Sequence, residues 1–220
     1  VDMTPIVVSR VGASHDGGAA EGYASASHIR QLLRQGGGGE ALAFLPPGAA
    51  EVLLRELAAG RIADGALVER AILARLRQMT EEEFAAYDGG GEGLYHRVYD
   101  AVRRCATVEE LLAAVKTKRY TAARLRRMVL SAWLGLSKAP ETVPYARVLA
   151  ANETGRALLR QMRKAGAPVL TKAADVAALG SGAEALFRRE AGYTDLYTLA
   201  YTDLAQAVPG SDWRLTPMMK

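Results

Sequence analysis

Hydrophobic residues along most of the chain recur at steps of three and four, a spacing that gives a helix one buried face. After Thr121, for example, Leu125, Met128, Val129 and Ala132 fall on a single face. The pattern predicts helices at 23–33, 49–59, 67–79, 94–105, 107–115, 121–136, 154–164 and 183–205. We therefore expect a protein that is mainly α.

Patterns typical of strands occupy only short stretches. Ile6, Val7 and Val8 are β-branched and apolar, as in a buried strand, which we expect to continue to Val11. Two further strands are expected at 145–150 and 168–171, on either side of the helix at 154–164. Strands joined in this way should be parallel, with a right-handed crossover. The fold should therefore add small α/β parts to a helical protein.

Glycine and proline clusters divide the chain. The glycines at 36–39 and the pair Pro46–Pro47 interrupt helical patterns, so we place a boundary after residue 45. The pattern changes again after Pro140. We predict three parts, 1–45, 46–140 and 141–220.

Hydroxyl side chains mark several helix starts, because they accept hydrogen bonds from the unpaired N–H groups of a first turn. The expected N-caps are Ser25 or Ser27, Thr80, Thr107 and Thr121. Thr80 and Glu83 have the spacing of a capping box. The three adjacent acids after Thr80 cannot converge on one point, so general acid–base catalysis there is not expected. We nominate no catalytic residue.

Composition excludes several classes of protein. No apolar run approaches the ~20 residues that span a bilayer, and no signal peptide precedes the first strand, so no membrane association is expected. The single cysteine, Cys105, excludes an internal disulfide and suits a reducing cytoplasm. No Cys-x-x-Cys or His-x-x-x-His pair occurs, so we expect no metal site built from protein ligands alone.

Positive charge is concentrated in one window. Between Glu110 and Glu141 there are seven cations and no carboxylate; the net charge of the chain is +4, so the remainder sums to −3. A local cluster of this kind suits a polyanion, since each cation that meets a phosphate releases a counterion. A solvated helix face normally interleaves both signs, although that plainer interpretation stays open. The predicted nucleic-acid contacts are Lys116, Lys118, Arg119, Arg124, Arg126 and Arg127.

The helix that follows Tyr23 is a second candidate site. Its serines leave N–H groups at a positive dipole end, and Arg30 in an early turn adds a cation, which suits a phosphate chain. Serine-capped helices with an early arginine are common, so this signal is weak by itself.

Several sequence blocks together resemble the bacterial tRNA(Met) cytidine acetate ligases, a nucleotidyltransferase-like family. They are EGLYHRVYDAVRRC from Glu92, VEELLAAVKTKRYTAARLRRMVL from Val108, PYARVLAANETGRALL from Pro144, PVLTK from Pro168 and YTDLYTLA from Tyr193. The resemblance implies the C-terminal part of a Rossmann-like nucleotidyltransferase domain, then a helical RNA-docking domain and a strand–helix–strand unit.

The resemblance also implies an activity. Members of the family use ATP, with Mg²⁺, to activate acetate as acetyladenylate, and then acetylate N4 of the wobble cytidine of elongator tRNA(Met) in the cytoplasm. The segment ASASHIR is similar to the element that holds nucleotide phosphates in this superfamily, which assigns Ser25, Ser27 and Arg30 to ATP. By the same likeness His15 and Asp16 lie at the edge of that site. The basic window becomes a tRNA-binding surface.

The chain departs from the family in one respect: it contains no His-x-Gly-His motif. It therefore resembles the later half of the family sequence, and we expect a missing N-terminal half of the nucleotide domain as a partner. The isolated chain should not activate acetate. The alternative is a helical RNA-binding module without chemistry of its own. The oligomeric state is left open.

Overall fold

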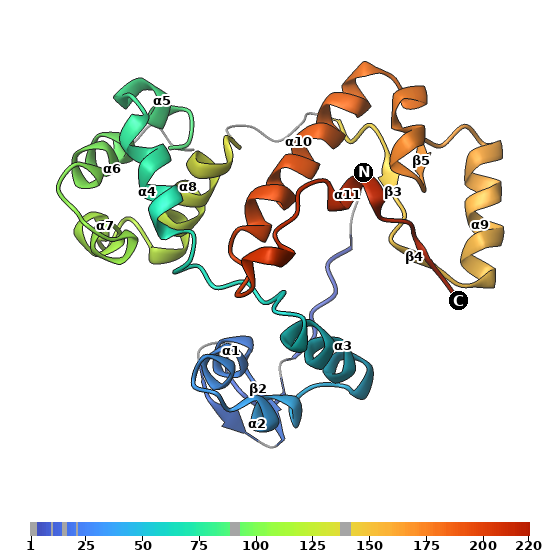
Figure 1. Cartoon of the computed structure of the whole chain (residues 1–220), viewed down its shortest axis with the longest axis horizontal. Coiled ribbons are helices and arrows are strands. Elements are labelled where there is room, and N and C mark those ends of the chain that lie inside the picture. The colour runs from blue at the N-terminus through green and yellow to red at the C-terminus, as the bar shows by residue number, and fades with distance from the viewer. Residues whose placement is uncertain (1–3, 10, 15–16, 21, 89–92, 137–141) are drawn as a thin grey trace. The chain divides into compact units, whose positions relative to one another are not determined.

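The computed structural model describes residues 4–9, 11–14, 17–20, 22–88, 93–136 and 142–220 (Figure 1). Backbone contacts group the chain into two compact units, Val1–Ala59 and Gly60–Lys220. The finer division into 1–45, 46–140 and 141–220 remains a prediction.

The first unit consists of short helices and one small hairpin. Strand β1 (Ala19–Ala20) pairs antiparallel with β2 (Tyr23–Ala24), and helix α1 (Ala26–Arg34) follows directly. Helix α2 (Gly38–Leu42) packs against α1, and α3 (Pro47–Ala58) ends the unit. Among the described residues of this unit the only strand pairing is this hairpin, so the expected Rossmann-like part contains no parallel sheet here.

The strand predicted from Ile6 to Val11 is wrong. Residues 4–9 have no regular secondary structure, and Ile6, Val7 and Val8 are 87%, 91% and 83% exposed. A strand exists only where its N–H and C=O groups pair with a neighbouring strand. No described residue pairs with this segment. Side-chain preference alone therefore does not make it a strand.

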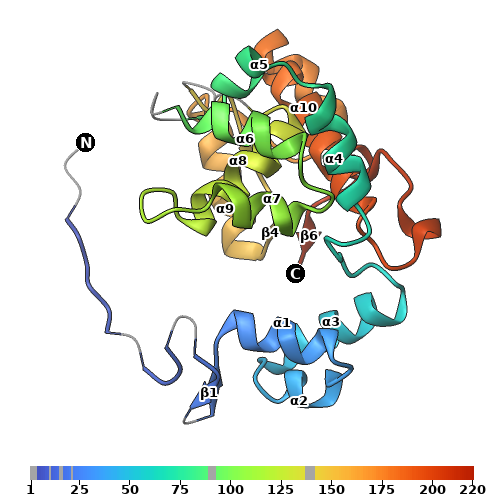
Figure 2. The ribbon, with the colours of Figure 1, turned by 90° about the vertical axis from the view of Figure 1, so that its left-hand side faces the viewer.

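The second unit begins with a helical bundle, seen as the green helices of Figure 2. Its helices are α4 (Glu69–Gln78), α5 (Glu81–Ala85), α6 (Leu94–Val102), α7 (Val108–Val115) and α8 (Ala122–Leu134). The predicted caps are confirmed. The hydroxyl groups of Thr80, Thr107 and Thr121 each accept a hydrogen bond from the backbone N–H of the residue three positions later. The first core contains Leu76, Phe84, Leu94, Val98, Val102, Leu111, Val115 and Leu125, each at most 1% exposed.

The rest of the second unit combines short strands with helices. Its elements are β3 (Ala146–Arg147), β4 (Ala150–Ala151), α9 (Glu153–Lys164), β5 (Val169–Leu170), η1 (Ala173–Leu179), α10 (Ser181–Thr198), η2 (Leu204–Gln206), α11 (Ser211–Arg214) and β6 (Met218–Met219). Strand β3 pairs parallel with β5, and β4 pairs parallel with β6. The predicted parallel strand–helix–strand unit is thus confirmed as β3–α9–β5. A second core, centred on Leu170 and Phe187, lies under α10.

The last long helix ends earlier than predicted. Helix α10 stops at Thr198 because the following residues bond to the start of the unit. The N–H of Asp64 donates to the carbonyl of Ala200 at 2.7 Å, and the N–H of Thr202 donates to that of Ile62 at 3.1 Å. Ala200 is buried in the first core. These hydrogen bonds between residues 60–64 and 200–203 join the segment before α4 to the segment after α10, and we call them the clasp.

Candidate functional site

The start of α1 is closed by Ser25, which is 1% exposed. Its hydroxyl accepts a hydrogen bond from the N–H of His28 at 3.1 Å and donates one to the carbonyl of Gly17 at 2.7 Å. Of the two predicted N-caps, Ser25 and Ser27, the cap is Ser25, and its hydroxyl also holds the preceding loop against the helix. Both bonds are internal, so Ser25 positions the start of the helix, and its contact with ATP stays a prediction.

Ser27 and Arg30 are exposed and lie three residues apart, on one face of α1. The first N–H groups of a helix have no acceptor within it, and α1 has no acidic residue in its first turn. N–H groups of this first turn, the Ser27 hydroxyl and the Arg30 guanidinium together suit an anion. Behind them His28 packs edge-on to Phe44, with ring centroids 6.1 Å apart. The predicted His15 and Asp16 lie outside the described residues.

The second candidate site surrounds the bend between α7 and α8. Tyr120 is the anchor of this bend, because it is buried and its N–H donates to the hydroxyl of Thr117 at 3.1 Å. Five of the six predicted cations, on the bend and on the first turns of α8, are exposed, and we call them the basic surface: Lys116, Lys118, Arg119, Arg126 and Arg127. No acidic side chain of the described residues forms an ion pair with Arg126 or Arg127.

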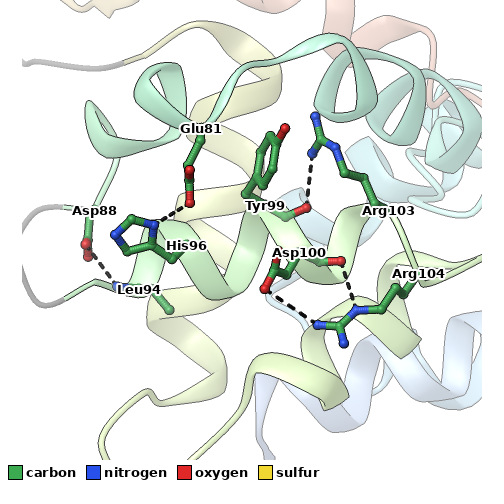
Figure 3. A network of polar contacts seen from close by, with 8 residues as sticks. All are labelled: Glu81, Asp88, Leu94, His96, Tyr99, Asp100, Arg103 and Arg104. Carbon is green, nitrogen blue, oxygen red and sulfur yellow. Dashed lines mark hydrogen bonds and ion pairs between the residues drawn. The ribbon is translucent and has the colours of Figure 1, made fainter.

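The sixth cation, Arg124, has a different environment. One of its Nη atoms donates to the backbone carbonyl of Asp88 at 3.0 Å and lies 3.4 Å from the Asp88 carboxylate. That carboxylate is buried, and its other oxygen accepts from the N–H of Leu94 at 3.1 Å (Figure 3). The guanidinium also lies 5.5 Å from the Tyr120 ring. Arg124 thus fixes α8 to the start of α6, a structural contact that the sequence pattern did not reveal.

The polar contacts around α6 are also internal to the bundle (Figure 3). His96 pairs with Glu81, which links α6 to α5. Arg103 donates to the carbonyl of Met79 at 3.1 Å, and its guanidinium lies 3.3 Å from the centre of the Tyr99 ring. Within the described ranges, no group of three or more His, Cys, Asp or Glu side chains could hold a metal ion.

Sequence reasoning missed one polar cluster in the second core. The Tyr145 hydroxyl donates to Glu190 at 2.6 Å, and Arg147 donates to the buried carboxylate of Asp212 at 2.6 Å. Burial, and then the adjacent Glu190, raise the pKa of Tyr145 well above its usual value. These residues line a hollow of about 350 Å³. Because they come from β3, α10 and α11, no local spacing could have brought them together.

Comparison with known proteins places this geometry among related structures. The chain matches the profile of a family described as HIGH Nucleotidyl Transferase over residues 1–210. The tRNA(Met) cytidine acetate ligase of Syntrophomonas wolfei subsp. wolfei is 25% identical in an alignment of 232 positions that covers 99% of this chain and 56% of that protein. The enzyme of the same name from Kosmotoga olearia is 33% identical over 77% of this chain and 42% of its own length. The chain thus spans about half the length of these relatives.

Solved structures give the same result. The crystal structure of Thermotoga maritima TmcAL (apo, form I) superposes with a TM-score of 0.87 at 25% identity, over 96% of this chain and 54% of that one. TmcAL bound with alpha-thio ATP gives a TM-score of 0.81 at 24% identity, over 91% of this chain and 53% of that one. The predicted nucleotidyltransferase-like fold is therefore confirmed. No helix among the described residues is long and apolar enough to cross a bilayer.

Proposed function

Because this chain belongs to the HIGH Nucleotidyl Transferase family, we propose that it forms part of a ligase that consumes ATP to modify tRNA. The reaction would activate acetate as acetyladenylate and acetylate N4 of the wobble cytidine of elongator tRNA(Met). The observation that carries this proposal is an alignment with a tRNA(Met) cytidine acetate ligase, which covers 99% of the chain at 25% identity. A cytoplasmic location and a partner that supplies the rest of the nucleotide domain belong to the same proposal.

The start of α1 fits the phosphates of ATP. Its open N–H groups, the Ser27 hydroxyl and the Arg30 guanidinium offer donors to an anion, and Ser25 holds the preceding loop in place. ATP supplies the phosphoanhydride whose cleavage drives adenylation of acetate. Mg²⁺ would be held mainly by the phosphate oxygens, which are hard ligands. His15 and Asp16 are proposed at the edge of this site.

The basic surface fits the backbone of tRNA. Its cations are exposed and surround a bend fixed by the buried Tyr120, so they are presented on a rigid support. The duplex stems of an RNA are recognised mostly by their shape and through their phosphates and 2′-hydroxyl groups. We assign the contact to Lys116, Lys118, Arg119, Arg126 and Arg127, while Arg124 holds the surface in place through Asp88.

Two arginines on the same helix test the nucleotide half of the proposal. Arg30→Ala should weaken ATP binding about tenfold, because a charge-assisted hydrogen bond contributes about 1.5 kcal/mol or more. Arg34→Ala removes the same charge at the other end of α1 and should leave ATP affinity within about twofold. Isothermal titration of each variant with ATP provides the measurement. Equal losses in both variants would mean that α1 attracts ATP only by its net charge.

A non-catalytic RNA-binding module is the second candidate, favoured by one observation: the five cations of the basic surface are exposed. This candidate predicts salt-dependent tRNA binding and no ATP binding. ATP–pyrophosphate exchange with acetate, measured on the 220-residue chain, should give no turnover under either proposal. Binding of ATP to the chain separates them, because only the ligase proposal requires it. Exchange by the chain alone would show that it activates acetate without a partner.

A further inference from the structure

A second stretch without acidic residues lies beyond the basic surface. Between Glu153 and Asp175 there is no carboxylate. The same stretch contains five cations: Arg156, Arg160, Arg163, Lys164 and Lys172. It covers nearly all of α9 and the whole of β5 (Figure 1). Surfaces that are merely solvated usually mix both signs of charge, so a second stretch that is only positive favours binding of an anionic ligand.

The fold gathers four of these cations around one hollow, which we call the α9 groove. Its volume is about 360 Å³, and α9, the residues after β5 and the segment leading into β6 form its walls. The lining residues are Arg156, Leu159, Arg160, Arg163, Thr171, Lys172, Thr216, Pro217 and Met219. None of them is acidic or aromatic. The groove therefore offers cations and hydroxyl groups around a small apolar floor.

The cations of the groove keep most of their hydrogen-bonding capacity. Arg163 donates to the hydroxyl of Thr171 at 2.7 Å, which orients its guanidinium and leaves its other N–H groups available. Arg156 lies 3.8 Å from Glu153, whose side chain is 90% exposed, so this pair is weak. Arg160 and Lys172 form no ion pair with any described acidic residue.

We propose that the α9 groove binds the phosphate backbone of tRNA, as a second contact in addition to the basic surface. This inference rests on the proposed function. Arg156, Arg160 and Arg163 recur at steps of four and three, so they share one face of α9. They span seven residues, or about 10 Å at a rise of 1.5 Å per residue. A nucleic-acid backbone presents successive phosphates over that length, so each cation of the row can meet a phosphate of its own.

Two other anionic ligands fit the groove less well. A free nucleotide site usually encloses the base among apolar and aromatic side chains, and the lining of the groove contains no aromatic residue. A helix that lies on a membrane surface needs a broad apolar face with aromatic anchors, and α9 contains no aromatic residue. The cations of the groove surround a hollow and are presented by three separate segments, which suits a ridge of phosphates better than a flat bilayer.

The test compares two triple variants of the full chain that remove the same charge. The groove variant combines Arg156→Ala, Arg160→Ala and Lys172→Ala, all exposed positions, and keeps the Arg163–Thr171 bond. The control combines Arg55→Ala, Arg70→Ala and Arg188→Ala, three exposed arginines on other helices. The Kd for unmodified tRNA is measured between 50 and 200 mM salt, and circular dichroism confirms that both variants fold.

Each phosphate contact contributes about 0.7–0.9 to the slope of log K against log salt, so the groove variant should lower the slope by about 2–3. The control should lower it by less than about 1, because it alters only the distant field. Equal slopes in the two variants would overturn the inference. It would also be overturned if the groove variant lost binding to phosphatidylserine vesicles while its tRNA binding was unchanged.

The failure of the proposed function has a different signature. If the unaltered chain binds no tRNA at any of these salt concentrations, both proposals are wrong. If it binds tRNA, and Arg126→Ala with Arg127→Ala lowers the slope while the groove variant does not, only the inference about the α9 groove is wrong. The basic surface then carries the contact alone.

Discussion

Replacing Arg124 by methionine should destabilise the helical bundle, whereas the same replacement of Arg126 should not. The two residues lie on the same helix and carry the same charge. Arg124 is held by Asp88, whereas Arg126 is exposed. Methionine keeps an apolar stem for packing against Tyr120 and removes only the guanidinium. The pair Arg124→Met and Arg126→Met therefore isolates the structural contact from the loss of one positive charge.

The size of the effect follows from burial. The Asp88 side chain is 2% exposed and that of Arg124 is 29% exposed. Removing one partner of a fully buried pair costs about 3–5 kcal/mol. The partial exposure of Arg124 lowers this cost, and Asp88 still accepts the N–H of Leu94. We therefore expect a loss of about 2 kcal/mol for Arg124→Met. Arg126→Met should change the free energy of unfolding by no more than about 0.5 kcal/mol.

Urea denaturation followed by far-ultraviolet circular dichroism measures both values, and an unchanged m-value would show that only stability has altered. Asp88→Asn, alone and combined with Arg124→Met, completes a double-mutant cycle, in which the two losses should add to clearly more than the loss in the double variant. The reasoning is refuted if Arg124→Met leaves stability unchanged and weakens tRNA binding as much as Arg126→Met does. Arg124 would then act in RNA binding, as the sequence alone suggested.

Two further predictions concern stability elsewhere in the second unit. Burial and the neighbouring Glu190 raise the pKa of Tyr145, so the folded protein should lose stability as pH rises above about 10, where only the unfolded chain releases this proton. Urea titrations from pH 8 to 11 should show a smaller loss of stability in Tyr145→Phe than in the unaltered chain. Parallel curves of stability against pH would contradict this. Gly60→Ala should cost at least about 2 kcal/mol, because Gly60 has φ +67° and an added Cβ would lie 2.4 Å from the Cβ of Asp203. Gly182→Ala, a helical position with open space, should instead stabilise by about 0.5–1 kcal/mol, and thermal melts that rank the two variants the other way would refute the geometry.

Features that depend on neighbouring residues could be predicted from the sequence. The caps at Ser25, Thr80, Thr107 and Thr121 were found because a hydroxyl group and the N–H it accepts from lie within one turn. The helices at 67–79 and 107–115 could be predicted for the same reason, since hydrophobic periodicity involves residues only three or four positions apart. The parallel pair β3–β5 followed from the order strand, helix, strand.

Features that depend on distant segments could not be predicted. Ile6, Val7 and Val8 have the composition of a strand, but a strand is decided by its partner, which no local pattern specifies. The end of α10 is set by residues 60–64, more than a hundred positions earlier in the chain. Arg124 could not be told from Arg126 because its partner, Asp88, lies 36 residues away. The α9 groove, by contrast, has a signal in the sequence, because residues 154–174 contain five cations and no carboxylate, as the window around the basic surface does.

The clasp places residues 60–64, which precede α4, directly beside residues 200–203, which follow α10. Everything from α4 to α10 is therefore an excursion that starts and finishes at adjacent backbone atoms. The chain then returns to the same body, because β6 pairs with β4 and Asp212 accepts a hydrogen bond from Arg147. Cutting the chain at the clasp would therefore separate α11 and β6 from the residues they pack against, so the clasp is a closure inside the unit.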